Sequence, residues 1–270
     1  MSGKGISIFA IVYNEEERIV DFLRSFSWSD DIVLVDKSST DRTVELARPF
    51  GPTIISVPYT DEVARLASAG LEATKNEWVM MATASDVIHP KLARRLLDAI
   101  NEPGFDYDAI SMPYSIYVFG IKDPRSPWYA TREDKLARKS IIRFSDRVHE
   151  ERGTSPSKTY SLPSDEGEEL LHLTHRNLDV FFEHHLRYCR LEADKYVDEG
   201  GMKAALGEIL KACKTVFLDK KSYKMGPDGM ALGIAYISYF MMKYLFIWQK
   251  FRAKGDEAYR DIKRRILGEE

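Results

Sequence analysis

Cysteine is scarce in this sequence of 270 residues. Its two cysteines, Cys189 and Cys213, lie in helix-like segments and lack the spacing of a metal site. We expect two free thiols in a reducing compartment, with no disulfide between them. The N-terminus carries one lysine and a short apolar run that leads into acidic sequence, which is unlike a signal peptide. The sequence therefore predicts a cytoplasmic protein.

An excess of positive charge is also lacking. The chain has 39 Lys and Arg against 42 Asp and Glu, a formal net charge of -3 and a pI near 6.1. No global field attracts a polyanion, so nucleic acid is not an expected partner. Apolar residues make up 44% and charged residues 30%, as in soluble globular proteins. The length suffices for one large α/β domain with a modest extension.

A glycine-rich phosphate loop is missing after the first apolar run. This run, Ile6–Val12, ends at Tyr13-Asn14 and three glutamates, and neither G-x-G-x-x-G nor G-K-S/T follows it. A dinucleotide or P-loop site is therefore excluded, and a nucleotidyltransferase is disfavoured. The acidic and amide groups found there suit the ring N–H and ribose hydroxyls of a nucleoside better than its phosphates.

The first 41 residues have the pattern strand, helix, strand. A helix-period segment at 15–26 carries four apolar residues on one face, and a second apolar run at 32–35 ends at Asp36. Continuously apolar strands predict a parallel sheet covered on both faces by helices. Ligands of such sheets bind beyond the carboxyl ends of the strands, which makes residues 13–15 and 36–41 the predicted wall of a site. Alternatively, these polar residues only cap helices.

The rest of the chain continues this alternation before it becomes helical. Further strands are predicted at 53–57, 78–82 and 139–144, and helices at 43–47, 61–73, 90–100, 177–198, 202–218 and from about 230. Residues 108–119 are predicted as one or two strands interrupted at Pro113. The polar residues 153–167 are predicted as a mobile loop.

Two motifs near the N-terminus resemble a known family. The patterns Y-N-E-E-E-R-I at 13–19 and W-S-D-D-I-V-L-V-D-K-S-S-T-D-R-T at 28–43 resemble the opening of inverting family 2 glycosyltransferases with the GT-A fold. The closest resemblance is to the subgroup that contains lipopolysaccharide-core glucosyltransferases, and it extends to about Trp248. It implies an α/β GT-A domain at 1–175, with a Rossmann-like, mixed and mainly parallel sheet flanked by helices. A helical extension associated with the membrane or the acceptor would follow at 176–270.

The resemblance implies a nucleotide-sugar donor, most simply a UDP-sugar. In the family, the end of the first strand and the aspartate after the second strand hold the nucleotide, which implicates Tyr13, Asn14, Glu15 and Asp36. Arg65 lies in the predicted helix 61–73, where family members have an arginine that faces the nucleotide pocket. From the sequence alone, Arg65 is a solvated helix residue.

The metal motif of the family is replaced in this chain. Family members carry Asp-x-Asp after the fourth strand and bind Mg²⁺ or Mn²⁺ there, whereas this chain has Thr83-Ala84-Ser85 followed by Asp86. Asp86 would hold the metal weakly beside Ser85, because a diphosphate and waters supply most of the six ligands. Alternatively, Arg65 and other cations neutralise the leaving diphosphate without a metal. A third interpretation is a nucleotide-sugar-binding protein that has lost its chemistry.

A candidate base follows the strand predicted at 139–144. Val148-His149-Glu150 matches a Val-His-Glu of the resembled subgroup, at the place where the active site needs an acid beside the acceptor. Inverting transfer is a single displacement, so one base must take the proton of the acceptor hydroxyl. We predict that Glu150 is this base, with His149 beside it. Alternatively, Glu150 pairs with Arg147 or Arg152 and His149 only packs.

An apolar and aromatic segment at 231–247 is almost long enough to span a bilayer, but Lys243 interrupts it. A transmembrane, an interfacial and a buried core helix are the alternatives. Basic residues after Lys250 suit an anionic surface, and the resembled subgroup acts on glycolipids, which favours peripheral contact with the inner face of a membrane. The predicted activity is inverting hexosyl transfer from a nucleotide sugar to a glycan or glycolipid such as lipopolysaccharide core.

Overall fold

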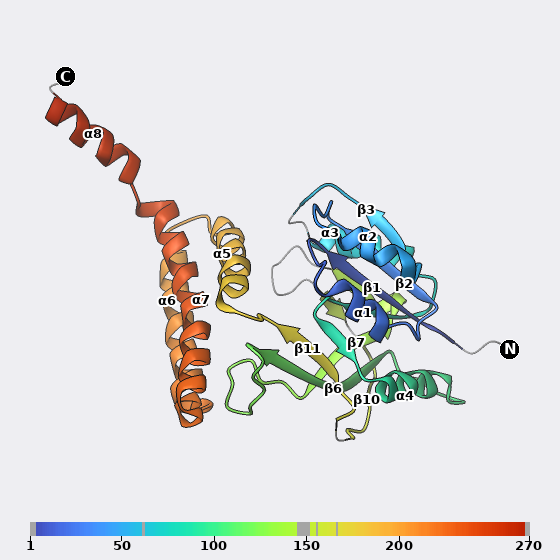
Figure 1. Cartoon of the computed structure of the whole chain (residues 1–270). Helices are drawn as coiled ribbons and strands as arrows, with labels where there is room; N and C mark the ends of the chain where they lie inside the picture. Colours follow the sequence, from blue (N-terminus) through green and yellow to red (C-terminus); the bar gives the residue numbers. More distant parts are fainter. Residues whose placement is uncertain (1–3, 61–62, 145–151, 155, 166, 268–270) are drawn as a thin grey trace. The chain divides into compact units, whose positions relative to one another are not determined.

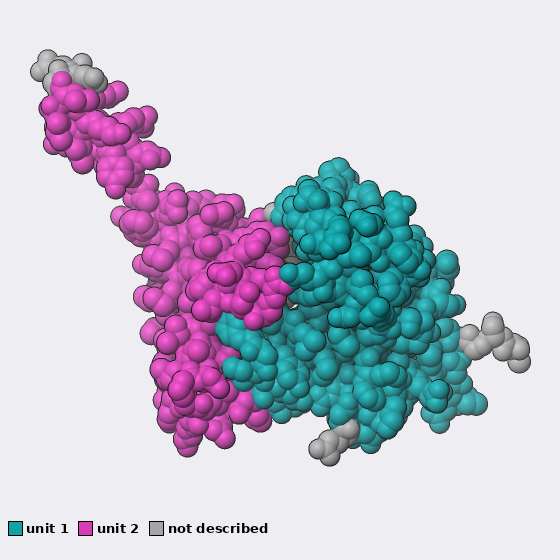
Figure 2. Space-filling view, viewed as in Figure 1, with its two compact units in different colours: residues 1–122, 129–175 teal, residues 123–128, 176–270 magenta. Residues whose placement is uncertain are grey.

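The computed structural model describes all residues except 1–3, 61–62, 145–151, 155, 166 and 268–270. The chain forms two compact units, one of residues 1–122 and 129–175 and one of residues 123–128 and 176–270 (Figure 2). The helical unit thus includes the short loop 123–128, which the sequence analysis placed in the first domain.

The N-terminal half of the first unit is a parallel sheet. Its strands lie in the order β3-β2-β1-β4 (Figure 1), and they are β1 (Ile6–Val12), β2 (Asp31–Asp36), β3 (Thr53–Ser56) and β4 (Trp78–Ala82). The connecting helices are α1 (Ile19–Ser25), α2 (Thr43–Ala47), the 3-10 turn η1 (Arg48–Phe50) and α3 (Val63–Ala73). Val12 pairs with Asp36, and Ala10 pairs with Ala82. The carboxyl ends of these strands therefore meet at one edge of the sheet.

The same sheet continues past β4 in the order β7-β6-β11-β5, with β10 paired to β6. The elements are β5 (Asp86–Ile88), α4 (Pro90–Asn101), β6 (Ala109–Val118), β7 (Arg132–Arg138), β10 (Thr159–Ser161) and β11 (Leu170–Thr174). A separate hairpin joins β8 (Ile142–Phe144) and β9 (Arg152–Thr154) after the 3-10 turn η2 (Lys139–Ile141). Since β7 is antiparallel to both β4 and β6, the sheet is mixed and mainly parallel, as predicted.

Several segments differ from the prediction. β7 was not predicted, and the strand predicted at 139–144 is the turn η2 followed by the short strand β8. β6 is continuous through Pro113, because this residue pairs with Arg132 at the start of β7 and the irregularity of the ladder lies between Ile110 and Met112 instead. The polar segment 153–167 is not loop throughout, since its β10 joins the sheet beside β6. Backbone pairing with β6 and the packing of Tyr160 against Phe105 and Tyr107 hold β10 there.

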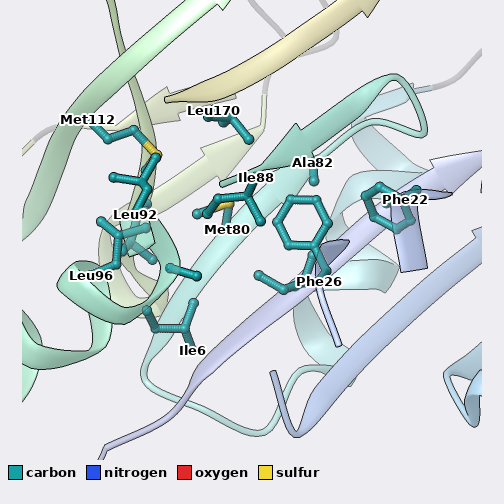
Figure 3. Packing of buried hydrophobic residues seen from close by; sticks show 14 of the residues in the cluster. Ile6, Phe22, Phe26, Met80, Ala82, Ile88, Leu92, Leu96, Met112 and Leu170 are labelled. Carbon is teal, nitrogen blue, oxygen red and sulfur yellow. The ribbon is translucent and has the colours of Figure 1, made fainter. Parts of the chain in front are cut away.

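The core of the first unit lies between the sheet and its helices. Figure 3 shows Phe22 of α1 and Phe26, which directly follows α1, beside Met80 and Ala82 of β4, with residues of α4 in the same cluster. Each buried phenylalanine stabilises the fold by roughly 1.5–3 kcal/mol. On α3, Gly70 cannot be replaced freely, because a Cβ there would lie 2.7 Å from the ring of Phe9.

The second unit is helical. It consists of α5 (Leu178–Asp194), α6 (Gly200–Lys214), a π-helical turn η3 (Thr215–Asp219), the 3-10 turn η4 (Ser222–Met225), α7 (Pro227–Arg252) and α8 (Gly255–Leu267). α7 packs against both α5 and α6. The side chain of Asn177 caps α5 by accepting from the N–H of Val180 at 3.0 Å. The ring of Trp128, from the loop 123–128, packs edge-on against Phe181 and Tyr236.

Candidate functional site at the carboxyl ends of the strands

The loops after β1 and β2 are tied together by Asn14. Its N–H donates to the hydroxyl of Ser39 at 3.0 Å, and its Oδ1 accepts from the N–H of Thr40 at 2.8 Å. Asn14 has a φ of 54°, a conformation that asparagine tolerates better than most residues. Asp36 is buried and accepts from the N–H of Ser39 at 3.1 Å. Asn14 and Asp36 therefore shape this edge together, and Asn14 does not cap a helix.

Glu15 and Asp41 are engaged within the same edge. The N–H of Glu15 donates to the hydroxyl of Thr43 at 2.6 Å, and its carboxylate pairs with Arg18 at 2.5 Å. Asp41 accepts from the N–H of Glu16 at 3.0 Å. Burial would raise the pKa of Asp41, but hydrogen bonds from Thr43 and Glu16 outweigh it and lower this pKa. Both acids thus anchor the loops, Asp41 as an ionised carboxylate.

Aromatic rings and a cation lie beside these loops. Tyr13 meets the ring of Tyr59 edge-on, with 4.8 Å between centroids, and the ammonium of Lys37 lies 4.3 Å from the centroid of Tyr59. Lys37 is buried although it follows β2 directly. Tyr13 and Lys37 lie within the predicted wall of the site, at 13–15 and 36–41, whereas Tyr59 was not predicted. Arg65 is exposed on α3.

The loop after β4 holds a buried carboxylate. Asp86 is fully buried, and its Oδ2 accepts from the ammonium of Lys135 at 2.6 Å and from the N–H of Thr83 at 2.9 Å. Its Oδ1 accepts from Nδ1 of His172 at 2.8 Å. Burial alone would raise the pKa of Asp86, but the charge of Lys135 and the bond from His172 hold it well below its usual range. The lowered pKa keeps Asp86 ionised at neutral pH.

Two hydroxyls complete this group. The hydroxyl oxygens of Thr83 and Ser85 lie 3.0 Å apart, and they lie 3.5 and 3.4 Å from Nδ1 of His172. We call Thr83, Ser85, Asp86, Lys135 and His172 the Lys135 cluster. Because Ala82 pairs with Ala10, the cluster lies beside the end of β1 and the loops described above. The sequence analysis missed Lys135 and His172, because their partner Asp86 is 49 and 86 residues away.

The Lys135 cluster does not fit a divalent metal. Mg²⁺ requires near-octahedral oxygen ligands, usually including a carboxylate. Both oxygens of Asp86 already accept hydrogen bonds, and Thr83 and Ser85 offer only neutral hydroxyls in their place. Among the described residues, no group of three or more His, Cys, Asp and Glu is arranged to hold a metal ion. The predicted metal role of Asp86 therefore has no support in this geometry.

The predicted base cannot be placed here. Glu150 and His149 lie outside the described residues, between β8 and β9. Their catalytic role stays a prediction that rests on the Val-His-Glu motif.

The sequence also matches known proteins. A profile described as Glycosyl transferase family 2 matches residues 7–159. The uncharacterized glycosyltransferase RP128 of Rickettsia prowazekii is 26% identical over 148 residues, which cover 54% of this chain and 50% of that protein. The uncharacterized glycosyltransferase RT0209 of Rickettsia typhi is 33% identical over 90 residues, which cover 33% of this chain and 30% of that protein. The chain thus matches half or less of the length of these relatives.

A solved structure shares the fold. The mannosyltransferase PcManGT from Pyrobaculum calidifontis, in complex with GDP-Man and Mn²⁺, superposes with a TM-score of 0.51 at 13% identity. The superposition covers 93% of this chain and 88% of that one. At this identity the likeness shows the GT-A fold alone, with its curled sheet flanked by helices.

Proposed function

The chain belongs to glycosyl transferase family 2, and we propose that it is an inverting hexosyltransferase that uses a UDP-sugar as donor and a glycan or glycolipid as acceptor. The observation that carries this proposal is the polar edge at the carboxyl ends of β1, β2 and β4. Asn14, Asp36 and the Lys135 cluster lie together there, where ligands of such sheets bind.

The edge offers different chemistry at its two ends. The buried carboxylate of Asp36 and the rings of Tyr13 and Tyr59 suit a nucleoside, whose ribose and base offer hydroxyls, a ring N–H and flat faces. The Lys135 cluster offers an ammonium, an imidazole and two hydroxyls, which suit phosphate oxygens. A nucleoside diphosphate would thus extend from β2 towards β4.

Glu150 would act as the base in the transfer itself. The acceptor oxygen forms a bond to the anomeric carbon while the bond from that carbon to the diphosphate oxygen breaks, and the configuration inverts. The proton of the acceptor hydroxyl passes to Glu150, and the bonding pair leaves with the nucleoside diphosphate. Donors around the diphosphate stabilise the charge that develops on it.

Features of the helical unit support the proposal that the acceptor is linked to a lipid. α7 is long and apolar enough to cross a membrane by its length and composition alone. Its Lys243 points inward, 7% exposed, and pairs with Glu192 of α5 at 3.0 Å and with Glu208 of α6. The residue that interrupts the apolar run is therefore neutralised inside the unit, and the outer surface of α7 stays apolar.

This outer surface is a continuous stripe. Large apolar residues recur every three, four or seven positions on one side of α7 and are 38–61% exposed: Met230, Ile234, Met241, Leu245 and Trp248. Such a contiguous set of exposed apolar side chains on one helix face is typical of an interaction surface. The unit also carries 19 Lys and Arg against 15 Asp and Glu, a net charge of +4, whereas the whole chain carries -3.

We propose that this unit lies on an anionic membrane face, with the stripe of α7 among the acyl chains. The acceptor would then be a glycolipid such as lipopolysaccharide core, on the cytoplasmic side where nucleotide sugars are available. The choice of lipopolysaccharide rests on the resemblance of the sequence motifs and not on the helical unit.

Transfer is tested with UDP-glucose, a lipopolysaccharide-core acceptor and the purified chain, by following release of UDP. Glu150→Gln should reduce the rate by at least about 100-fold, because the carboxamide accepts no proton. Glu151→Gln is the matched control and should leave most of the activity. Equal activity of the wild type and Glu150→Gln would contradict the base assignment.

A second candidate function is nucleotide-sugar binding without transfer. The replacement of Asp-x-Asp by Thr83-Ala84-Ser85 favours it. In this case the wild type would bind a nucleoside diphosphate but release none from the donor with any acceptor, and Glu150→Gln would bind it equally well.

A further inference from the structure

The negative charge of a donor diphosphate would lie at the loop after β4 and has to be balanced there. A nucleoside diphosphate carries several negative charges, and the structure of PcManGT is a complex with GDP-Man and Mn²⁺. The side chains of the Lys135 cluster do not fit such an ion. Some other arrangement must therefore balance the diphosphate if this chain binds one, so the inference below rests on the proposed function.

We infer that this chain holds its donor diphosphate without a divalent metal, through the hydroxyls of Thr83 and Ser85 and the nitrogens of Lys135 and His172. Asp86 positions this group and takes no part as a metal ligand. The site would recognise a nucleoside diphosphate in its free, metal-unbound form.

The donors are arranged around one point. Lys135 and His172 come from different strands, β7 and β11, and both are held by Asp86 at 2.6 and 2.8 Å. An ammonium has three N–H groups, so Lys135 keeps donors beyond its bond to Asp86. All side-chain hydrogen bonds of His172 to described residues go through Nδ1. In the protonated ring both nitrogens are donors, so Nε2 donates to a phosphate oxygen while Nδ1 stays bonded to Asp86. Thr83 is exposed, and its hydroxyl lies 3.0 Å from that of Ser85.

The replacement of the family's two aspartates by Thr83 and Ser85 is consistent in charge with a site that holds no metal ion. Two aspartates at positions 83 and 85 would carry a charge of about -2 and would repel a diphosphate unless a dication lay between them. Thr83 and Ser85 carry no charge, so the loss of two carboxylates and of the metal leaves the local charge unchanged. Hydroxyls also donate to phosphate oxygens, which carboxylates cannot do.

Burial strengthens the ion pair between Asp86 and Lys135. Asp86 is fully buried and the side chain of Lys135 is only 13% exposed, so water screens their interaction weakly. The ring of Tyr114 lies 5.1 Å from the ammonium of Lys135 and closes one side of the group. An ammonium fixed in this way does not have to be ordered when the diphosphate arrives, which lowers the entropic cost of binding.

The test measures affinity for UDP and GDP by calorimetry, in EDTA and again with Mn²⁺. For the wild type, we expect one of the two nucleotides to bind with dissociation constants that differ by less than about threefold between the two conditions. The electron paramagnetic resonance signal of free Mn²⁺ should not fall further when protein is added to the Mn²⁺–nucleotide mixture.

A double variant reverses the charge balance. Thr83→Asp with Ser85→Asp should weaken binding in EDTA by about 100-fold, because two carboxylates then face the diphosphate. Mn²⁺ should restore most of this affinity. The matched control, Thr83→Asn with Ser85→Asn, adds similar volume without charge and should bind equally in EDTA and in Mn²⁺.

The outcomes separate this inference from the proposed function. Binding by the wild type only with Mn²⁺ would overturn the inference and leave the glycosyltransferase proposal standing. No binding of either UDP or GDP under either condition would overturn the donor site itself. Binding in EDTA that the aspartate pair does not weaken would show that the diphosphate lies elsewhere, and would also overturn the inference.

Discussion

The charge state of one residue, Asp86, is set by contacts from two other strands. Its carboxylate is removed from water and accepts hydrogen bonds from Lys135 and His172. Loss of one partner from a buried ion pair lowers the free energy of unfolding by more than the intact pair adds to it. The reason is that the remaining charge stays buried without compensation. Asp86 thus supports both the sheet and the proposed diphosphate site.

We predict that Asp86→Asn lowers the free energy of unfolding by about 3 kcal/mol at pH 7, because Lys135 loses its counter-charge. Urea denaturation measures the difference. The pKa of Asp86 is lower in the folded than in the unfolded chain, where it is near 3.8. Its contribution is therefore complete above that value and is lost as the pH falls through the lower, folded pKa.

The difference between the wild type and Asp86→Asn should accordingly be constant from pH 7 to about pH 5 and narrow below about pH 4. Asp98→Asn is the control, since Asp98 is exposed on α4. A difference between wild type and Asp86→Asn that stayed constant down to pH 2 would contradict the assigned ion pair.

Among the elements, α7 has two sides of opposite character. Its inner side carries Lys243 and Tyr239, whose hydroxyl donates to Glu192 at 2.8 Å. Burial would lower the pKa of Lys243, but hydrogen bonds to Glu208 and Glu192 raise it above its usual value, so this lysine stays charged. Its outer side is the apolar stripe described above. One helix thus combines an ionic core contact with an apolar outer surface.

We predict that Ile234→Gln with Leu245→Gln weakens binding to vesicles of phosphatidylglycerol and phosphatidylcholine by about tenfold or more. Each of these exposed side chains would add up to about 1.5–3 kcal/mol to the free energy of vesicle binding if it moved fully from water into the acyl chains. A side chain that is only half inserted would add less. Co-sedimentation with vesicles measures the effect.

The control for this variant is Phe50→Gln, a change of an exposed apolar residue in the first unit. It should leave vesicle binding unchanged. If the chain forms dimers in solution, and the stripe variant abolishes dimers without changing vesicle binding, the stripe is an interface between two copies instead.

The molecule as a whole has an uneven distribution of charge. The first unit carries a net charge of -7 and the second +4, which together give the -3 of the chain. An anionic surface therefore attracts the helical unit and repels the catalytic one. This asymmetry would favour one orientation on a membrane, although the net charge of the chain has the wrong sign for adsorption.

We predict that vesicle binding requires anionic lipid and weakens by about tenfold between 0.1 and 0.5 M NaCl. Each basic residue near such a surface contributes about 1 kcal/mol, and salt shortens the range of this attraction. The measurement is co-sedimentation with vesicles of phosphatidylcholine alone and with 30% phosphatidylglycerol. Equal binding to both vesicle types at 0.1 M NaCl would contradict this prediction and show that the apolar stripe acts without electrostatic help.

The local pattern of the sequence was sufficient for the first four strands and for the edge of the site. Continuous apolar runs predict buried parallel strands, and the polar residues at their ends, such as Asn14 and Asp36, are predictable because sequence position fixes where a strand ends. The family followed from motifs within this same stretch.

Only the tertiary structure decided which side chains meet. Lys135 and His172 converge on Asp86 because β7 and β11 join the sheet on either side of β6, and strand order is not a local property of the sequence. Likewise, Lys243 interrupts an apolar run in the sequence, but its inward direction depends on the acids of α5 and α6. The sequence by itself determined the fold class, the first four strands and the edge of the site. The strand order beyond β4, the charge partners and the apolar stripe arise from contacts between distant segments.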